Sequence, residues 1–323
     1  MFSFGWRNNY GGRNNSWKKF ALFAGATEAI LLSSTIPVKD EKQRQELHES
    51  MVLNIKKAIL KLRDQEFNNA EDLLHVALGI AQQIKDEQAE IFILDLLANM
   101  YFETRDYVKA EKAFKEVLSR ELSSGRPEDT ESVIEISAKL AKMYAEKGDT
   151  EKAKSGFDFC IEKFEKVFAE LTENNKEEVM DLYFKVVQWG SELLVDMESK
   201  SEESLKEATK LIEKALQKAK ELKQTGSMSY QTLANNLSTL SAWQNRVEEA
   251  VEMMTDTIKL AMSSGHWSLG SFHLNLAHIY AEHGDFANAE IQMKKAEDWA
   301  KSRKDEILAK EIERLKEDLR HRK

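Results

Sequence analysis

Apolar residues recur along most of this chain at the three- and four-residue spacing of amphipathic helices. The clearest example is Ile134–Val167, which reads as two helices joined by a tight turn at Gly148-Asp149. Each helix has one apolar face, formed by Leu140, Ala141 and Tyr144 in the first and by Ala153, Phe157 and Cys160 in the second. Gly148 suits a left-handed helix end, and Asp149 suits the start of the next helix.

A small side chain marks the start of the apolar face in each second helix. It recurs at intervals of 39 to 55 residues, at Ala70, Ala110, Ala153, Ala208, Ala250 and Ala289. A small residue at such a position lets two helix backbones pass closely, and a larger one would force them apart. The recurrence therefore predicts about six helix pairs that pack side by side.

This order of large, small, aromatic, turn glycine and small residue resembles the tetratricopeptide repeat, although the usual period is shorter, at about 34 residues. The resemblance implies an all-α, right-handed superhelical solenoid over residues 41–303. Residues 304–323 are expected to add a capping helix, because only one of its faces is apolar. That face is formed by Leu308, Ile312, Leu315 and Leu319.

Composition supports a helical chain and limits its partners. Only Pro37 and Pro127 could interrupt helices among the 323 residues. The net charge is −9, and acidic and basic residues are mixed along the helices, so we expect no nucleic-acid partner. The single cysteine, Cys160, cannot form an internal disulfide and falls at a core position, which favours a small buried hydrophobe.

Residues 1–40 differ in character from the rest and are expected to be a mitochondrial targeting leader. Residues 1–39 hold five basic side chains and one acidic one, Glu28. The apolar stretch at 20–38 is nearly long enough to cross a bilayer, but Glu28 lies near its middle. A single membrane anchor and the tail of a cleaved presequence are both open, and a secretory signal fits less well.

Motifs that would indicate catalysis are absent from the sequence. It contains no glycine-rich phosphate loop and no Gly-x-Ser-x-Gly turn. The nearest histidine cluster has spacings of 7, 5 and 5 residues, which do not stack imidazoles on one helical face; its members are His266, His273, His278 and His283. We therefore expect no catalytic residues, cofactor or metal, and read these histidines as surface or groove residues.

A stack of helix pairs offers a groove lined by the first helix of each pair, where such proteins hold peptides. Counting from the large repeat residue, the candidates for this groove are Phe92, Asn99, Lys142, Thr239 and His278. They could equally be ordinary solvent-facing positions. The positions that would hold a terminal carboxylate in chaperone-type repeats carry the wrong residues, which argues against a chaperone-tail receptor.

Three segments carry a more specific resemblance. They are Val133–Ile161, Asn69–Asn99 and Arg303–Ile307, which include Val133-Ile134-Glu135-Ile136-Ser137, Lys139-Leu140-Ala141, Phe157-Asp158-Phe159-Cys160-Ile161 and Asp95-Leu96-Leu97-Ala98-Asn99. They resemble the mitochondrial tetratricopeptide repeat protein 19 family over about residues 45–323, most strongly over 66–165. The stretch 171–231 departs most from that family.

This resemblance implies a non-enzymatic protein of the mitochondrial inner membrane. Members of the family bind respiratory complex III, support its assembly and maintenance, and help to clear fragments of its Rieske iron–sulfur subunit. The basic residues before the apolar stretch favour a body that faces the intermembrane space. The alternative is a cytosolic cargo or peptide adaptor resembling kinesin light chain, whose repeats have a similarly long period.

Overall fold

The computed structural model describes residues 41–197 and 201–322, and in these ranges every regular element is an α-helix. The all-α prediction is therefore confirmed. The expected leader at 1–40 and its apolar stretch at 20–38 lie outside the described residues. Within the described ranges, no helix is both long and apolar enough to span a bilayer. The chain divides after Asp149 into two compact units, which are considered in turn.

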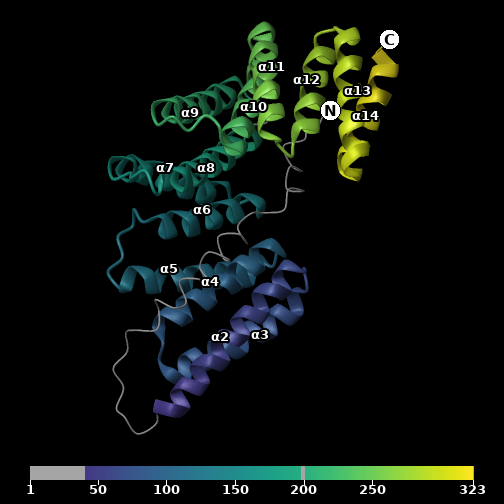
Figure 1. Ribbon diagram of the computed structural model, residues 1–323. Coiled ribbons are helices and arrows are strands. Elements are labelled where there is room, and N and C mark those ends of the chain that lie inside the picture. The colour runs from purple at the N-terminus through teal and green to yellow at the C-terminus, as the bar shows by residue number, and fades with distance from the viewer. Residues whose placement is uncertain (1–40, 198–200, 323) are drawn as a thin grey trace. The chain divides into compact units, whose positions relative to one another are not determined.

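The first unit contains two complete helix pairs and a further helix. Its helices are α2 (Glu41–Arg63), α3 (Phe67–Ile84), α4 (Glu87–Glu103), α5 (Tyr107–Ser123) and α6 (Glu131–Glu146). Consecutive helices pack together, α2 with α3 and α4 with α5, and α6 follows on α5 (Figure 1). These are the antiparallel helix pairs that the sequence pattern predicts.

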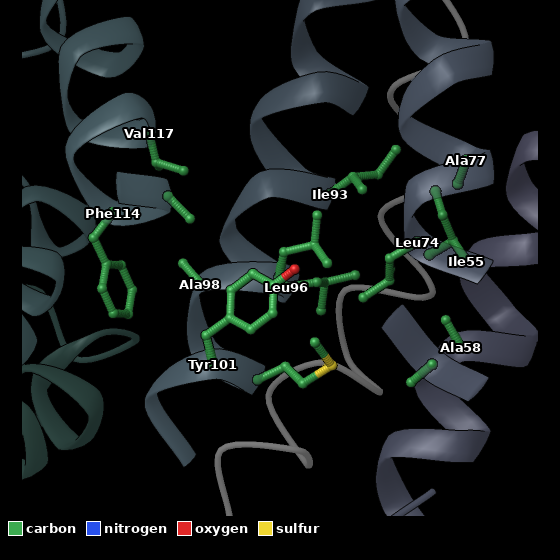
Figure 2. Packing of buried hydrophobic residues seen from close by; sticks show 14 of the residues in the cluster. Ile55, Ala58, Leu74, Ala77, Ile93, Leu96, Ala98, Tyr101, Phe114 and Val117 are labelled. Atoms are coloured by element: carbon green, nitrogen blue, oxygen red, sulfur yellow. The ribbon is translucent and has the colours of Figure 1, made fainter. Parts of the chain in front are cut away.

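The core of this unit lies between the helix pairs. Leu74, Ile93, Leu96 and Phe114 are fully buried, and Figure 2 shows them converging from α3, α4 and α5. Tyr101 closes one side of this core. Its side chain reaches back across the helix pairs to a carboxylate on α3.

Tyrosines at the aromatic repeat position join neighbouring pairs by hydrogen bonds. The Tyr101 hydroxyl donates to Glu71 at 2.7 Å, and the Tyr144 hydroxyl donates to Glu111 at 2.9 Å. Each acceptor follows directly after a repeat alanine. Lys115 and Lys147 also donate to Glu111, and together they lower its pKa to about 2. The same contact in successive repeats fixes the spacing between them.

The described residues of the second unit, 150–197 and 201–322, form eight helices. They are α7 (Thr150–Ala169), α8 (Lys176–Met197), α9 (Glu202–Glu221), α10 (Met228–Trp243), α11 (Val247–Ser264), α12 (Leu269–Glu282), α13 (Phe286–Arg303) and α14 (Glu306–Arg322). The closest pairs are α8 with α9, α10 with α11 and α12 with α13, and α14 packs on α12 and α13 (Figure 1). The apolar stripe expected on the last helix is buried there.

The fourth repeat has a core built largely from aromatic rings. Tyr183 of α8 packs edge-on against Phe164 and Phe168 of α7, with both centroid distances at 4.9 Å. Ala208, Ala215 and Ala219 of α9 are also fully buried, so this repeat combines the aromatic rings with small residues.

All six repeat alanines are completely buried, which confirms the spacing read from the sequence. Gly148 also has the positive φ expected at a helix end. Cys160 is fully buried, and burial raises the pKa of its thiol to about 12, as expected of a core residue.

Candidate protein-binding surfaces

The five predicted groove residues all lie on first helices of their pairs. Phe92 and Asn99 lie on α4, Lys142 on α6, Thr239 on α10 and His278 on α12. Phe92, Lys142 and His278 are half-buried, so they leave part of each side chain accessible. Asn99 is 8% exposed and Thr239 is 1% exposed, so these two offer almost no surface to a partner.

Asn99 and Thr239 are buried because their side chains bond within the chain. The Asn99 amide donates to the carbonyl of Asp95 at 2.8 Å, one turn earlier in α4. The Thr239 hydroxyl makes the equivalent bond to the carbonyl of Asn235 at 3.2 Å. The role of these two positions in a groove stays a prediction, and their burial leaves little side-chain surface for it.

In the first unit, a charged network connects α4 with α6. Lys139 of α6 donates to the side-chain oxygen of Asn99 on α4 and pairs with Glu135 at 2.8 Å. The two helices thus meet through polar side chains that are 40 residues apart, which is also the interval from Ala70 to Ala110.

Burial alters the pKa values of the charged groups in this network. Burial raises the pKa of the Asp95 carboxyl to about 6, with Glu135 adding to the increase while Lys139 and Asn99 oppose it. Burial alone would lower the pKa of Lys139, but the carboxylates of Glu135 and Asp95 raise it overall. Lys139 therefore stays protonated, whereas Asp95 exchanges its proton close to neutral pH.

A second polar cluster connects α10 with α12 in the second unit. The Asn275 amide donates to the side-chain oxygen of Asn235 at 3.0 Å, again across 40 residues, and Asn235 donates to Asn236 at 3.2 Å. Asn235 and Asn236 are only 2% and 7% exposed, so this cluster joins the two helices and offers little surface to a partner.

Two of the four candidate histidines are buried rather than at the surface, which corrects the expectation from sequence. His266 is 0% exposed and contacts the Met228 carbonyl at 3.1 Å, and its other ring nitrogen accepts from the Ser268 amide at 2.9 Å. His273 is 7% exposed and bonds to Gln292 at 2.8 Å. Burial lowers the pKa of both, so they serve the core as neutral imidazoles.

Among the described residues, no three side chains of the types that bind metals lie close enough to share an ion. The histidines of α12 and its preceding loop point into separate contacts. The site of interest is therefore the polar surface of the first helices, with Lys142, Phe92 and His278 as its accessible members.

Comparison with known proteins gives a consistent picture. A family model of the tetratricopeptide repeat matches residues 270–303, which cover α12 and α13. The chain is 27% identical to the Drosophila melanogaster homolog of mitochondrial tetratricopeptide repeat protein 19 over 252 residues, covering 78% of this chain and 66% of that protein. It is 29% identical to the Homo sapiens protein, covering 84% of this chain and 72% of that protein.

Solved structures support the same fold. The apo form of RapI superposes with a TM-score of 0.66 at 16% sequence identity, over 94% of this chain and 77% of that one. At this identity the likeness concerns the fold alone. The relatives thus confirm the resemblance seen in the sequence, and the solved structure confirms the helical-repeat fold.

Proposed function

We propose that this chain is a non-enzymatic scaffold that binds respiratory complex III. It is a tetratricopeptide repeat protein, and most of its length is similar to mitochondrial tetratricopeptide repeat protein 19. The observation that carries the proposal is the extent of the similarity, which covers 84% of this chain in the human comparison. It includes both units and therefore the first-helix surfaces of each.

The first-helix surfaces provide the chemistry that such a scaffold needs. The first helices of the first unit carry a half-buried ring, Phe92, a half-buried carboxylate, Glu135, and a half-buried cation, Lys142, which suit a partner with mixed charge and an apolar anchor. Within complex III, we propose that the client includes the Rieske protein and that the scaffold supports clearance of its fragments as well as assembly and maintenance.

Location follows from the same relatives, which are named as mitochondrial. We propose association with the inner membrane and a body that faces the intermembrane space. Basic side chains precede residues 20–38, and positive charge next to a membrane segment is retained on the inner side, here the matrix. The chain after this segment would then face the intermembrane space.

A null cell line tests the function. Loss of the protein is expected to lower complex III activity and to leave Rieske fragments accumulating, and return of the full chain should reverse both effects. Normal complex III activity in the null line would contradict the proposal.

Fractionation tests the location. After import into isolated mitochondria, the body should resist added protease until the outer membrane is opened. A chain that stays in the cytosol at full length would instead agree with the adaptor alternative and would overturn the mitochondrial proposal.

A further inference from the structure

A cavity of about 250 Å³ lies in the second unit between α7 and α9, with α8 beneath it. Its apolar lining comes from all three helices: Phe157, Ile161, Gly190, Leu193, Leu194 and Leu211. α8 packs against both neighbours, so it forms a fixed floor (Figure 1). The walls belong to second helices of their pairs, so this cavity is separate from the first-helix surfaces described above.

The cavity is large enough for one bulky apolar side chain. An apolar cavity of roughly 150 Å³ accepts a molecule the size of benzene, so this one can accept a phenyl or indole group. Gly190 leaves part of this space open. A methyl group at Gly190 would lie 3.6 Å from Cβ of Phe157 and 3.7 Å from Leu211, at ordinary contact distances.

Ion pairs connect the two walls. Lys154 of α7 lies 3.4 Å from Glu207 of α9, and Glu165 of α7 lies 2.6 Å from Lys214 of α9. The facing segments 154–165 and 207–214 extend over roughly 16 Å and 10 Å at ~1.5 Å per residue. These exposed ion pairs contribute roughly 0–1 kcal/mol each, so the walls can separate slightly at low cost.

The charges at the rim favour a negatively charged occupant. Of the charged lining residues, three are lysines and two are acids, Asp158 and Glu207. Lys154 is shared between those two acids, and Lys214 is paired with Glu165. Lys210 is exposed and, among the described residues, forms no ion pair. A carboxylate beside the cavity would supply the missing partner of Lys210.

We propose that this cleft between α7 and α9 is a second protein-binding site, which takes an amphipathic helix of a partner that inserts one aromatic side chain above Gly190 and places a carboxylate against Lys210. The facing stripes of α7 and α9 are long enough for about two turns of such a helix. The site goes beyond the proposed function, because it uses helices that the first-helix surfaces do not include.

Two model peptides test the site with the full chain. Each is an alanine- and glutamine-based helix of about 16 residues with one tryptophan, followed three positions later by glutamate in one peptide and lysine in the other. The glutamate peptide is expected to bind about tenfold more tightly by fluorescence anisotropy. Lys210→Glu should reverse this preference, while Lys220→Glu, the same change at an exposed position of α9 outside the cavity, should leave it unchanged.

Gly190→Leu fills the cavity and should abolish binding of both peptides, provided that its thermal unfolding resembles that of the wild type. If that variant fails to fold, the surface change Lys210→Glu still decides the matter. Equal binding of the two peptides, or a preference unaffected by Lys210→Glu, would overturn the proposal. Saturable binding of indole-3-propionate without binding of either peptide would also overturn it, because the cavity would then serve a small anionic ligand.

Discussion

Gly270 in the first turn of α12 sits where three helices meet. A β-carbon built there would lie 2.5 Å from Cδ1 of Trp299 on α13 and 2.6 Å from Cδ2 of Leu308 on α14. Both distances are far below normal contact, so any other residue would push α13 or α14 away from α12. Glycine is thus required at position 270 by the packing of α13 and α14, and not by the backbone conformation of residue 270.

Gly270→Ala should therefore reduce the free energy of unfolding by about 1–3 kcal/mol through overpacking. Gly79→Ala in α3 is the matched control, because nothing lies within 4 Å of its added methyl group. That control should stabilise the protein by about 0.5–1 kcal/mol, since alanine is the better helix former. Denaturant melts of both variants measure the difference, and a neutral Gly270→Ala would contradict the packing at α14.

Asp95 makes stability depend on pH. Its pKa is about 6 when folded against an ordinary value of 3.8. Between these values the folded chain holds a proton that the unfolded chain has lost, so the contribution of Asp95 to stability falls as the pH rises. Above pH 6 the cost is complete, because the ionised carboxylate is then buried.

Asp95→Asn removes this cost, so the variant should exceed the wild type in unfolding free energy by about 1–2 kcal/mol at pH 8. This gain is smaller than the full pKa shift of Asp95 would give, because the side chain is only half-buried and lies near Lys139. The advantage should shrink from pH 6 downward and vanish near pH 4. A difference that is constant across this range would show that Asp95 titrates normally.

At the scale of the helix, the ends are where sequence and structure differ most. Gly125, Gly148, Gly265 and Gly284 take the left-handed conformation, which a glycine in a turn predicts. Six helix ends use other residues in the same conformation: Gln65, Lys85, Arg105, Lys223, Asn245 and Lys304. No glycine marks these six ends, although their backbone N–H groups donate to the carbonyl three residues earlier just as Gly125, Gly148 and Gly284 do.

Lys85 tests the cost of such an end. Its φ is 56°, and its side chain is exposed. Lys85→Gly should raise the free energy of unfolding by about 1 kcal/mol, because glycine tolerates this conformation. Lys57→Gly, at an exposed position inside α2, should lower it by about the same amount. If both changes destabilise equally, the left-handed end at Lys85 does not exist in solution.

The repeat alanines test the helix pairing itself. Ala289 in the first turn of α13 is fully buried, whereas Ala287 two residues earlier is exposed. Ala289→Leu should lower the unfolding free energy by about 1–3 kcal/mol, and Ala287→Leu should change it by less than about 0.5 kcal/mol. Similar melting of the two variants would mean that the spacing of the small residues does not describe the packing.

These comparisons show what the sequence could predict. Periodic apolar positions and recurrent alanines predicted the helices and their pairing, because both follow from burial at fixed intervals. The burial of His266 and Asn99 was not predictable in the same way. It depends on bonds to residues on other helices, such as Met228 and Lys139, which no local pattern reports.

At the scale of the whole chain, two units each present first-helix surfaces with their own chemistry. The accessible members are Phe92 and Lys142 in the first unit and His278 in the second. The position of these surfaces followed from the repeat pattern. Their accessible members did not, because exposure depends on how closely neighbouring first helices approach.

Capture of complex III by the full chain tests the central claim most directly. The tagged protein, expressed in mitochondria of a null line, is expected to retain complex III subunits. Lys142→Glu on the first-helix surface should reduce the retained amount by about tenfold or more, while Lys112→Glu, an exposed lysine on the second helix α5, should not. Absence of complex III from the wild-type capture, or equal loss with both variants, would contradict the account.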